Sequence, residues 1–179
     1  MNRLAIPTTA AAASQPLLDA VNKQLGVVPN LMKLLGNSPV ALEGYLSLSG
    51  ALGKGALGAQ TGERIALAIA EINGCGYCLS AHTYLGKNLA HLDEAEIAAN
   101  RHGGSTDLKA DAAVRFAAQV ALQRGHVADL DVQAVKAAGF SDAQIVEIVV
   151  HVALNTLTNY VNEVAQTEID FPLVLPFAK

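Results

Sequence analysis

The chain has two cysteines, both in Cys75-Gly76-Tyr77-Cys78, and His82 follows four residues after the second. At about 100° per residue, a helix places Cys78 roughly 60° and His82 roughly 20° from Cys75 around its axis, so the three side chains share one face. A helix N-terminus and a neighbouring imidazole both favour the thiolate, which is the nucleophilic form of cysteine. These residues therefore predict a reactive thiol centre at the start of a helix.

Other interpretations of the same residues stay open at this point. Free cysteine is among the most buried residue types, so two buried small side chains and a hydrogen-bonded histidine fit the pattern as well. A structural zinc site usually takes four ligands, and the chain has no further cysteine to complete one. A c-type haem site needs histidine where this chain has Leu79, and a thioredoxin fold needs a βαβ pattern that the sequence lacks.

Glu63 is the carboxylate most suitably placed to serve these thiols. It belongs to a predicted buried helix over residues 59–73, where its neighbours on the helix face are apolar and mostly small. If the turn at Gly74 folds the next helix, about 75–86, back on this one, Glu63 reaches His82 or a cysteine and accepts a proton. The alternative is an ordinary glutamate in the first helical turn, favoured there by the helix dipole.

The elements that position these residues are all predicted to be helical. Apolar residues recur at helical spacing along nearly the whole chain, and no segment alternates with a period of two. Asp93 with Glu96 is typical of a capping box. We expect a single-domain, all-α helical bundle over residues 1–179, irregular at about 1–14 and 168–179, with a helix from 39 towards 49, a flexible link over 50–58, and helices over about 111–124, 131–138 and 141–166.

Composition narrows the classes of partner. The net charge is −4 and the basic residues are scattered, which argues against nucleic-acid binding. Apolar stretches are too short for a membrane span, and no secretory segment is evident, so we expect a cytoplasmic protein without membrane contact. Hydrophobic residues make up 51% of the chain and mean hydropathy is +0.31. This excess of apolar surface favours a subunit interface.

The last predicted helix carries a regular polar stripe, formed by His151, Asn155, Asn159 and Asn162 at spacings of four, four and three residues. The other faces of this helix are apolar, which gives it more apolar surface than one contact needs. A solvated face would favour lysine and glutamate, whereas uncharged amides suit a hydrogen-bonded seam. We therefore expect the helix to be shared between the core and a subunit interface in a homo-oligomer.

The segment from Glu63 to Thr83 resembles the core of the AhpD-like alkylhydroperoxidases, in the peroxidase-related branch of the carboxymuconolactone decarboxylase superfamily. The matching pattern is Glu63, eleven residues, Cys75, two residues, Cys78, three residues and His82, with Asn73-Gly74 and Ser80-Ala81-His82-Thr83 around it. The resemblance implies an all-α fold, a homo-oligomer built as a trimer or hexamer, and reduction of organic hydroperoxides.

In that scheme the resemblance makes Cys78 the peroxidatic thiol and Cys75 the resolving thiol, with Glu63 and His82 as the proton relay. One departure matters, because well-studied AhpD members have a second histidine directly before the later cysteine, where this chain has Tyr77. The decarboxylases of the superfamily generally lack the cysteine pair, which argues against lactone decarboxylation.

The resulting hypothesis is a thiol peroxidase that needs no cofactor and no metal. Its partners are an organic hydroperoxide and an external dithiol reductant, of lipoyl or thioredoxin type. The alternatives are a redox-responsive binding protein, in which the disulfide alters contact with a partner, and a disulfide reductase without peroxidase turnover.

Overall fold

The computed structural model describes residues 2–7 and 9–178, and these residues form helices and loops without a strand. The predicted all-α fold is therefore confirmed. In chain order the helices are α1 (Gln15–Leu25), α2 (Asn30–Leu35), α3 (Pro39–Leu52), α4 (Ala59–Asn73), α5 (Gly76–Asn88), α6 (Glu94–Arg101), α7 (Leu108–Leu122), α8 (Asp129–Ala137) and α9 (Asp142–Ala165). The segment expected as a flexible link over 50–58 is shorter, because α3 continues to Leu52.

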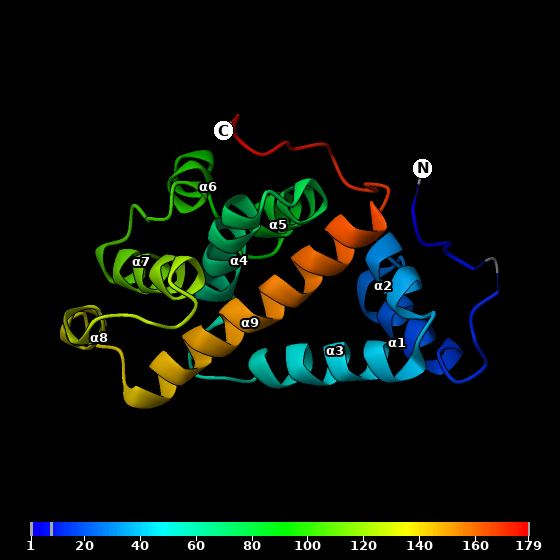
Figure 1. Cartoon of the computed structure of the whole chain (residues 1–179), viewed down its shortest axis with the longest axis horizontal. Helices are drawn as coiled ribbons and strands as arrows, with labels where there is room; N and C mark the ends of the chain where they lie inside the picture. Colours follow the sequence, from blue (N-terminus) through cyan, green and yellow to red (C-terminus); the bar gives the residue numbers. More distant parts are fainter. Residues whose placement is uncertain (1, 8, 179) are drawn as a thin grey trace.

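Helix α4 lies at the centre of the molecule, between α5, α6, α7 and α9 (Figure 1). Its residues are apolar or small on most faces, so it can be covered on all sides, and Ile65, Leu67 and Ile69 are completely buried. Burying each such side chain contributes about 1.5–3 kcal/mol. One core cluster joins α4 to α7, α8 and α9, and a second joins it to α1, α2, α3 and α5.

The turn between α4 and α5 brings the two halves of the cysteine motif together. Gly74 ends α4 in the left-handed conformation, at φ +69°, which glycine adopts without the clash of a Cβ atom. The next residue, Cys75, caps the N-terminus of α5. Because the chain reverses over these two residues, α5 packs back along α4.

The polar stripe of α9 lies inside the chain, and the prediction that it forms a subunit seam is wrong. Asn155, Asn159 and Asn162 are buried, and the latter two contact residues of α4 and α5. At about 100° per residue the opposite face of α9 carries the exposed apolar side chains. These are Val146, Val149, Leu157, Tyr160 and Val164. Periodicity revealed the stripe but not the side to which it turns.

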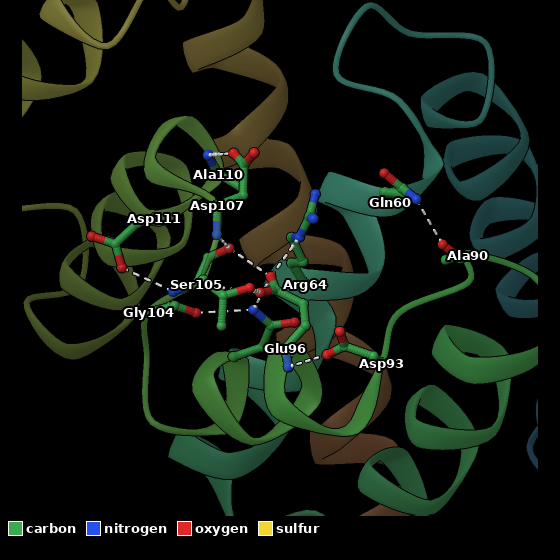
Figure 2. A network of polar contacts seen from close by, with 12 residues as sticks. Gln60, Arg64, Ala90, Asp93, Glu96, Gly104, Ser105, Asp107, Ala110 and Asp111 are labelled. Atoms are coloured by element: carbon green, nitrogen blue, oxygen red, sulfur yellow. Dashed lines mark hydrogen bonds and ion pairs between the residues drawn. The ribbon is translucent and has the colours of Figure 1, made fainter.

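A buried polar network closes the loop between α6 and α7 (Figure 2). Asp93 caps α6 by accepting a hydrogen bond from the backbone of Glu96, as predicted, but the Glu96 carboxylate does not return to close a capping box. It accepts hydrogen bonds instead from Arg64, Asn100, Ser105 and Thr106. The carboxylate therefore anchors a loop to α4.

Residues 166–178, which we call the C-terminal strap, run back across α5 towards α6 (Figure 1). The backbone N–H of Val174 donates to Ser80 Oγ at 2.9 Å, and that of Phe177 donates to Glu71 Oε1 at 2.7 Å. Ile169 and Pro176 lie close to Gly76, where a Cβ atom would meet both side chains within 4 Å. The strap thus covers the beginning of α5.

Among residues 2–7 and 9–178, no helix by itself has the length and hydropathy to cross a membrane. Helices α8 and α9 meet that criterion only when taken together, across a bend of 117°.

Candidate active site

The two cysteines form a disulfide at the start of α5, with their Cα atoms 5.3 Å apart. Both are buried, Cys75 completely and Cys78 with 2% of its surface exposed. Because Cys75 is the N-cap, its sulfur accepts a hydrogen bond from the backbone N–H of Cys78 at 3.2 Å. The first turn of the helix therefore stabilises negative charge on the sulfur that leaves when the disulfide is opened at Cys78.

Glu63 and His82 meet, as the folding back of α5 on α4 predicts. His82 Nδ1 lies 2.9 Å from Glu63 Oε2, and each side chain is about one fifth exposed. An ionised carboxylate only accepts hydrogen bonds, so Nδ1 donates and Nε2 stays available for proton exchange. This is the arrangement in which a carboxylate orients an imidazole for acid–base work.

A third helix contributes to the site in a way that the sequence did not reveal. Asn162 of α9 donates its side-chain N–H to Cys78 Sγ at 3.3 Å. One turn earlier, Asn159 accepts a hydrogen bond at 2.9 Å from Asn73, the last residue of α4. The four-four-three spacing was visible in the sequence, but the approach of α9 to α5 depends on packing between residues 84 positions apart.

Tyr77 occupies the position of the missing second histidine, and its hydroxyl is used structurally. It donates to Asp170 of the strap at 2.8 Å and accepts from the backbone N–H of Leu31 at 3.1 Å. Burial raises the pKa of Tyr77, and the charge of Asp170 raises it further. The phenol therefore stays protonated and holds the strap and α2 against the start of α5.

A cavity of about 600 Å³ opens beside the reactive groups. Cys78, His82 and Glu63 lie in its wall, whereas Cys75 is not among the described residues that line it. The rest of the wall is mostly apolar and comes from α1, the loop before α2, α2 itself, α3, α4, α5, α9 and Phe171 of the strap. None of the described lining residues is lysine or arginine. The cavity is therefore a mostly apolar chamber with the Cys78 sulfur and the Glu63–His82 pair in its wall.

His151 of α9 also lines this cavity, and its ring packs over Gly62 of α4. Burial lowers the pKa of His151, against the opposing charges of Glu147 and Glu63. A neutral imidazole at this point adds hydrogen-bonding capacity to the wall without adding charge. The sequence assigned His151 to the polar stripe but gave no sign that it faces Glu63.

Within the described part of the chain, no three histidine, cysteine or acidic side chains converge in a way that holds a metal ion. The chemistry that the described residues offer is that of a dithiol with a carboxylate and an imidazole beside it.

The chain is similar to known proteins both in sequence and in fold. Residues 39–121 match the model of the Carboxymuconolactone decarboxylase family. No curated protein matches the chain.

Solved structures resemble the chain over almost its whole length. An uncharacterized peroxidase-related protein from Ralstonia eutropha JMP134, described as an alkylhydroperoxidase AhpD core, is 23% identical with a TM-score of 0.83, over 94% of this chain and 92% of that one. A peroxidase-related protein from Silicibacter sp. TM1040 is 22% identical with a TM-score of 0.81, over 93% and 89%.

The debrominase Bmp8 in complex with 2,3,4-tribromopyrrole is 20% identical with a TM-score of 0.77, over 95% and 93% of the two chains. At these identities the likeness concerns the fold. The family match covers α3 to α7, which includes the whole cysteine motif, and the AhpD-core likeness covers 94% of this chain. Residues 39–121 therefore resemble the Carboxymuconolactone decarboxylase family, and the chain has the fold of the AhpD-core structures.

Proposed function

We propose that this protein is a thiol peroxidase that reduces organic hydroperoxides through a dithiol–disulfide cycle of Cys75 and Cys78. The observation that carries the proposal is the juxtaposition of a disulfide, a Glu63–His82 pair at 2.9 Å and a cavity that reaches Cys78 but not Cys75. The cavity supports Cys78 as the thiol that meets the substrate. Cys75, at a Cα–Cα distance of 5.3 Å, is close enough to resolve the product.

The cycle balances with the groups in the site and one external dithiol. The Cys78 thiol gives its proton to the relay and its thiolate attacks a peroxide oxygen, so that the O–O bond breaks. The departing alkoxide takes a proton from the relay and leaves as an alcohol, while Cys78 becomes a sulfenic acid. The Cys75 thiol attacks that sulfur, water leaves and the disulfide forms, and the external dithiol then reduces it.

The cavity supports a narrower substrate class, an uncharged organic hydroperoxide with an apolar body. Its volume of about 600 Å³ exceeds what hydrogen peroxide fills, and its described wall offers Glu63 but no lysine or arginine to pair with a carboxylate. A methyl-ester lipid hydroperoxide should therefore react at least about ten-fold faster than the corresponding free acid, since unpaired burial of a carboxylate is costly. Equal kcat/KM values would show that the cavity does not select against charge.

The decisive experiment is peroxide consumption with a reduced lipoyl or thioredoxin-type donor. Cys78→Ser should lose the reaction entirely, whereas Cys75→Ser should react once and accumulate a sulfenic acid that a dimedone-type probe traps. A sulfenic acid trapped on Cys75 in the Cys78→Ser protein would reverse the two roles. A single stoichiometric oxidation of the wild type, followed by altered association with a partner, would favour the redox-responsive binding protein instead.

Reductive dehalogenation is a second candidate, favoured by the uncharged cavity beside the dithiol and by the similarity to a debrominase. Two thiols supply two electrons, a carbon–bromine bond becomes a carbon–hydrogen bond, bromide leaves and the disulfide forms. Bromide release from tribromopyrrole in the presence of a dithiol tests this candidate. Release at a rate that exceeds hydroperoxide consumption would replace the peroxidase proposal.

We further propose that the chain assembles as a homo-oligomer, a trimer or hexamer, through the exposed apolar face of α9. Val149 and Leu157 lie on this face, two-fifths or more exposed, opposite the buried amides. Single exposed apolar residues are common, but a continuous stripe along one helix marks an interaction surface. Light scattering should give at least three protomers for the wild type and a lower mass for Val149→Lys with Leu157→Lys. An unchanged mass in the variant would place the interface elsewhere.

A further inference from the structure

We propose that Asn162 is a catalytic residue, whose side-chain amide stabilises the Cys78 thiolate by a hydrogen bond from α9. This inference rests on the proposed function for its role in turnover, while its effect on the thiol can be measured without any peroxide. The contact is direct, with Asn162 Nδ2 3.3 Å from Cys78 Sγ. It joins a buried donor to the atom that reacts.

The two sulfurs have different N–H donors. The backbone N–H of Cys78, at the start of α5, points to Cys75 Sγ at 3.2 Å, so the favourable end of the helix serves the resolving sulfur. Cys78 Sγ receives the Asn162 amide instead. A hydrogen bond to the charged form of a group favours that form, and it does so more strongly away from water. Asn162 is only 2% exposed, so water competes poorly for the same sulfur.

The far side of the same amide is left without a partner. Among the described residues, Asn162 Oδ1 is buried and accepts no hydrogen bond. A structural asparagine in a core normally satisfies both ends of its amide, and an unmet acceptor is costly. The sulfur of Cys78 is therefore the hydrogen-bond partner that the described structure gives to the Asn162 side chain.

Asn159 provides a matched control within the same stripe. It lies three residues earlier on α9, is completely buried and makes one side-chain hydrogen bond, to Asn73 at 2.9 Å. One end of its amide, Nδ2, is also without a partner among the described residues. Replacing either asparagine by leucine removes one buried side-chain hydrogen bond, but only Asn162→Leu removes a donor from sulfur.

The variants Asn162→Leu and Asn159→Leu both keep the other titratable groups near Cys78. Those that line the same cavity come from α3, α4, α5 and α9: Tyr45, Glu63, Tyr77, His82, Tyr84 and His151. Asp170 of the strap acts through its contact with Tyr77. Because both variants keep all of these groups, a difference in thiol titration between them reports the Asn162 amide.

The test is ultraviolet titration of the Cys78 thiolate in a Cys75→Ser background, where no second thiol absorbs. Asn162→Leu should raise the pKa of Cys78 by about one unit, and Asn162→Asp should raise it further because a carboxylate repels the thiolate. Asn159→Leu should leave the titration unchanged at a similar loss of thermal stability. Asn162→Gln, which keeps a donor, should recover part of the effect.

The inference would be overturned if Cys78 had the same pKa in Asn162→Leu and Asn159→Leu, or if Asn162→Asp did not shift that pKa. If Asn162→Leu does not fold, the isosteric Asn162→Asp variant decides by the same readout. In the chain with both cysteines, the rate of peroxide reaction of Asn162→Leu should fall about ten-fold at neutral pH and recover at alkaline pH. A protein that never turns over peroxide but shows the shifted titration would refute the proposed function and leave the role of Asn162 standing.

Discussion

Two glutamates, Glu63 on α4 and Glu96 on the neighbouring α6, illustrate different uses of a carboxylate. Glu96 is saturated: Arg64, Asn100, Ser105 and both polar groups of Thr106 donate to it, and its side chain is 5% exposed (Figure 2). Glu63, among the described residues, has a hydrogen bond to His82 alone and lines the cavity with its side chain 23% exposed. A carboxylate with no spare acceptor sites holds structure, whereas one with spare sites and a cavity can move protons.

The largest expected effect is a difference between the two glutamates in the rate of reaction with peroxide. Glu63→Gln should slow the reaction with peroxide by about 100-fold or more, because the amide cannot accept the proton that the relay passes on. Glu96→Gln should leave the rate of the folded protein within about two-fold. Stopped-flow oxidation under single-turnover conditions measures both. If the two variants slow equally, the distinction between the two carboxylates has no functional meaning.

The second prediction concerns the free energy of unfolding, for which Glu96 should matter more than Glu63. Glu96→Gln leaves the guanidinium of Arg64, whose side chain is 14% exposed, without its partner, and breaking such a buried pair costs about 3 kcal/mol. Glu63→Gln should cost less than about 1 kcal/mol, since its contact is part-exposed. Urea unfolding at neutral pH gives both values. A larger loss for Glu63→Gln would make the relay a structural pair.

The third prediction follows from the pKa of Glu96. Burial alone would raise it, but hydrogen bonds from Ser105, Thr106 and Asn100 lower it from its ordinary 4.5 to about 2. Because the folded pKa is the lower one, this carboxylate stabilises the fold fully above about pH 4.5 and loses that contribution as the pH falls towards 2. Glu96→Gln should therefore flatten the acid side of the stability profile. The same acid dependence in wild type and variant would exclude Glu96 as its source.

The smallest expected effects come from one glycine beside each glutamate. An added Cβ at Gly62 would lie 3.0 Å from the Cε1 atom of His151, and one at Gly104 would lie 2.8 Å from Asp111 Oδ1. Gly62→Ala should push the His151 ring towards the cavity and slow the reaction a few-fold. Gly104→Ala should cost about 1–2 kcal/mol of stability without changing the rate. Calorimetry measures the loss of stability and the single-turnover assay measures the rate. A slower reaction of Gly104→Ala would contradict the assignment of Gly104 to stability alone.

Much of this arrangement could be predicted from local pattern. Helix boundaries followed from caps and glycines, such as Ser38 before α3 and Gly74 after α4, because these residues satisfy the open backbone groups of a helix end. The meeting of Glu63 with His82 followed from two helices joined by a tight turn, which leaves few geometries. Both inferences depended on residues close in sequence.

The remainder depended on contacts that no local pattern encodes. Asn162 meets Cys78 across 84 residues and Asp170 meets Tyr77 across 93, through packing of α9 and the strap against α5. Helical periodicity located the amide stripe of α9, but an uncharged polar face and an apolar face are both compatible with burial. The polar face turns inward because Asn73 and the sulfur of Cys78, which lie outside α9, provide hydrogen-bond partners for its amides.

The strap and α9 also determine when the thiols become protected during biosynthesis. Asn162 follows Cys78 by 84 residues, which at about 5–20 residues per second takes roughly 4–17 seconds to synthesise. For that interval the nascent chain carries Cys75 and Cys78 without α9 and the strap, which later pack against α5. A disulfide closed early encloses only Gly76 and Tyr77 and restrains nothing distant, so α9 can still dock over it. Translation in an oxidising environment should therefore delay neither folding nor the first reduction of the Cys75–Cys78 disulfide by an external dithiol.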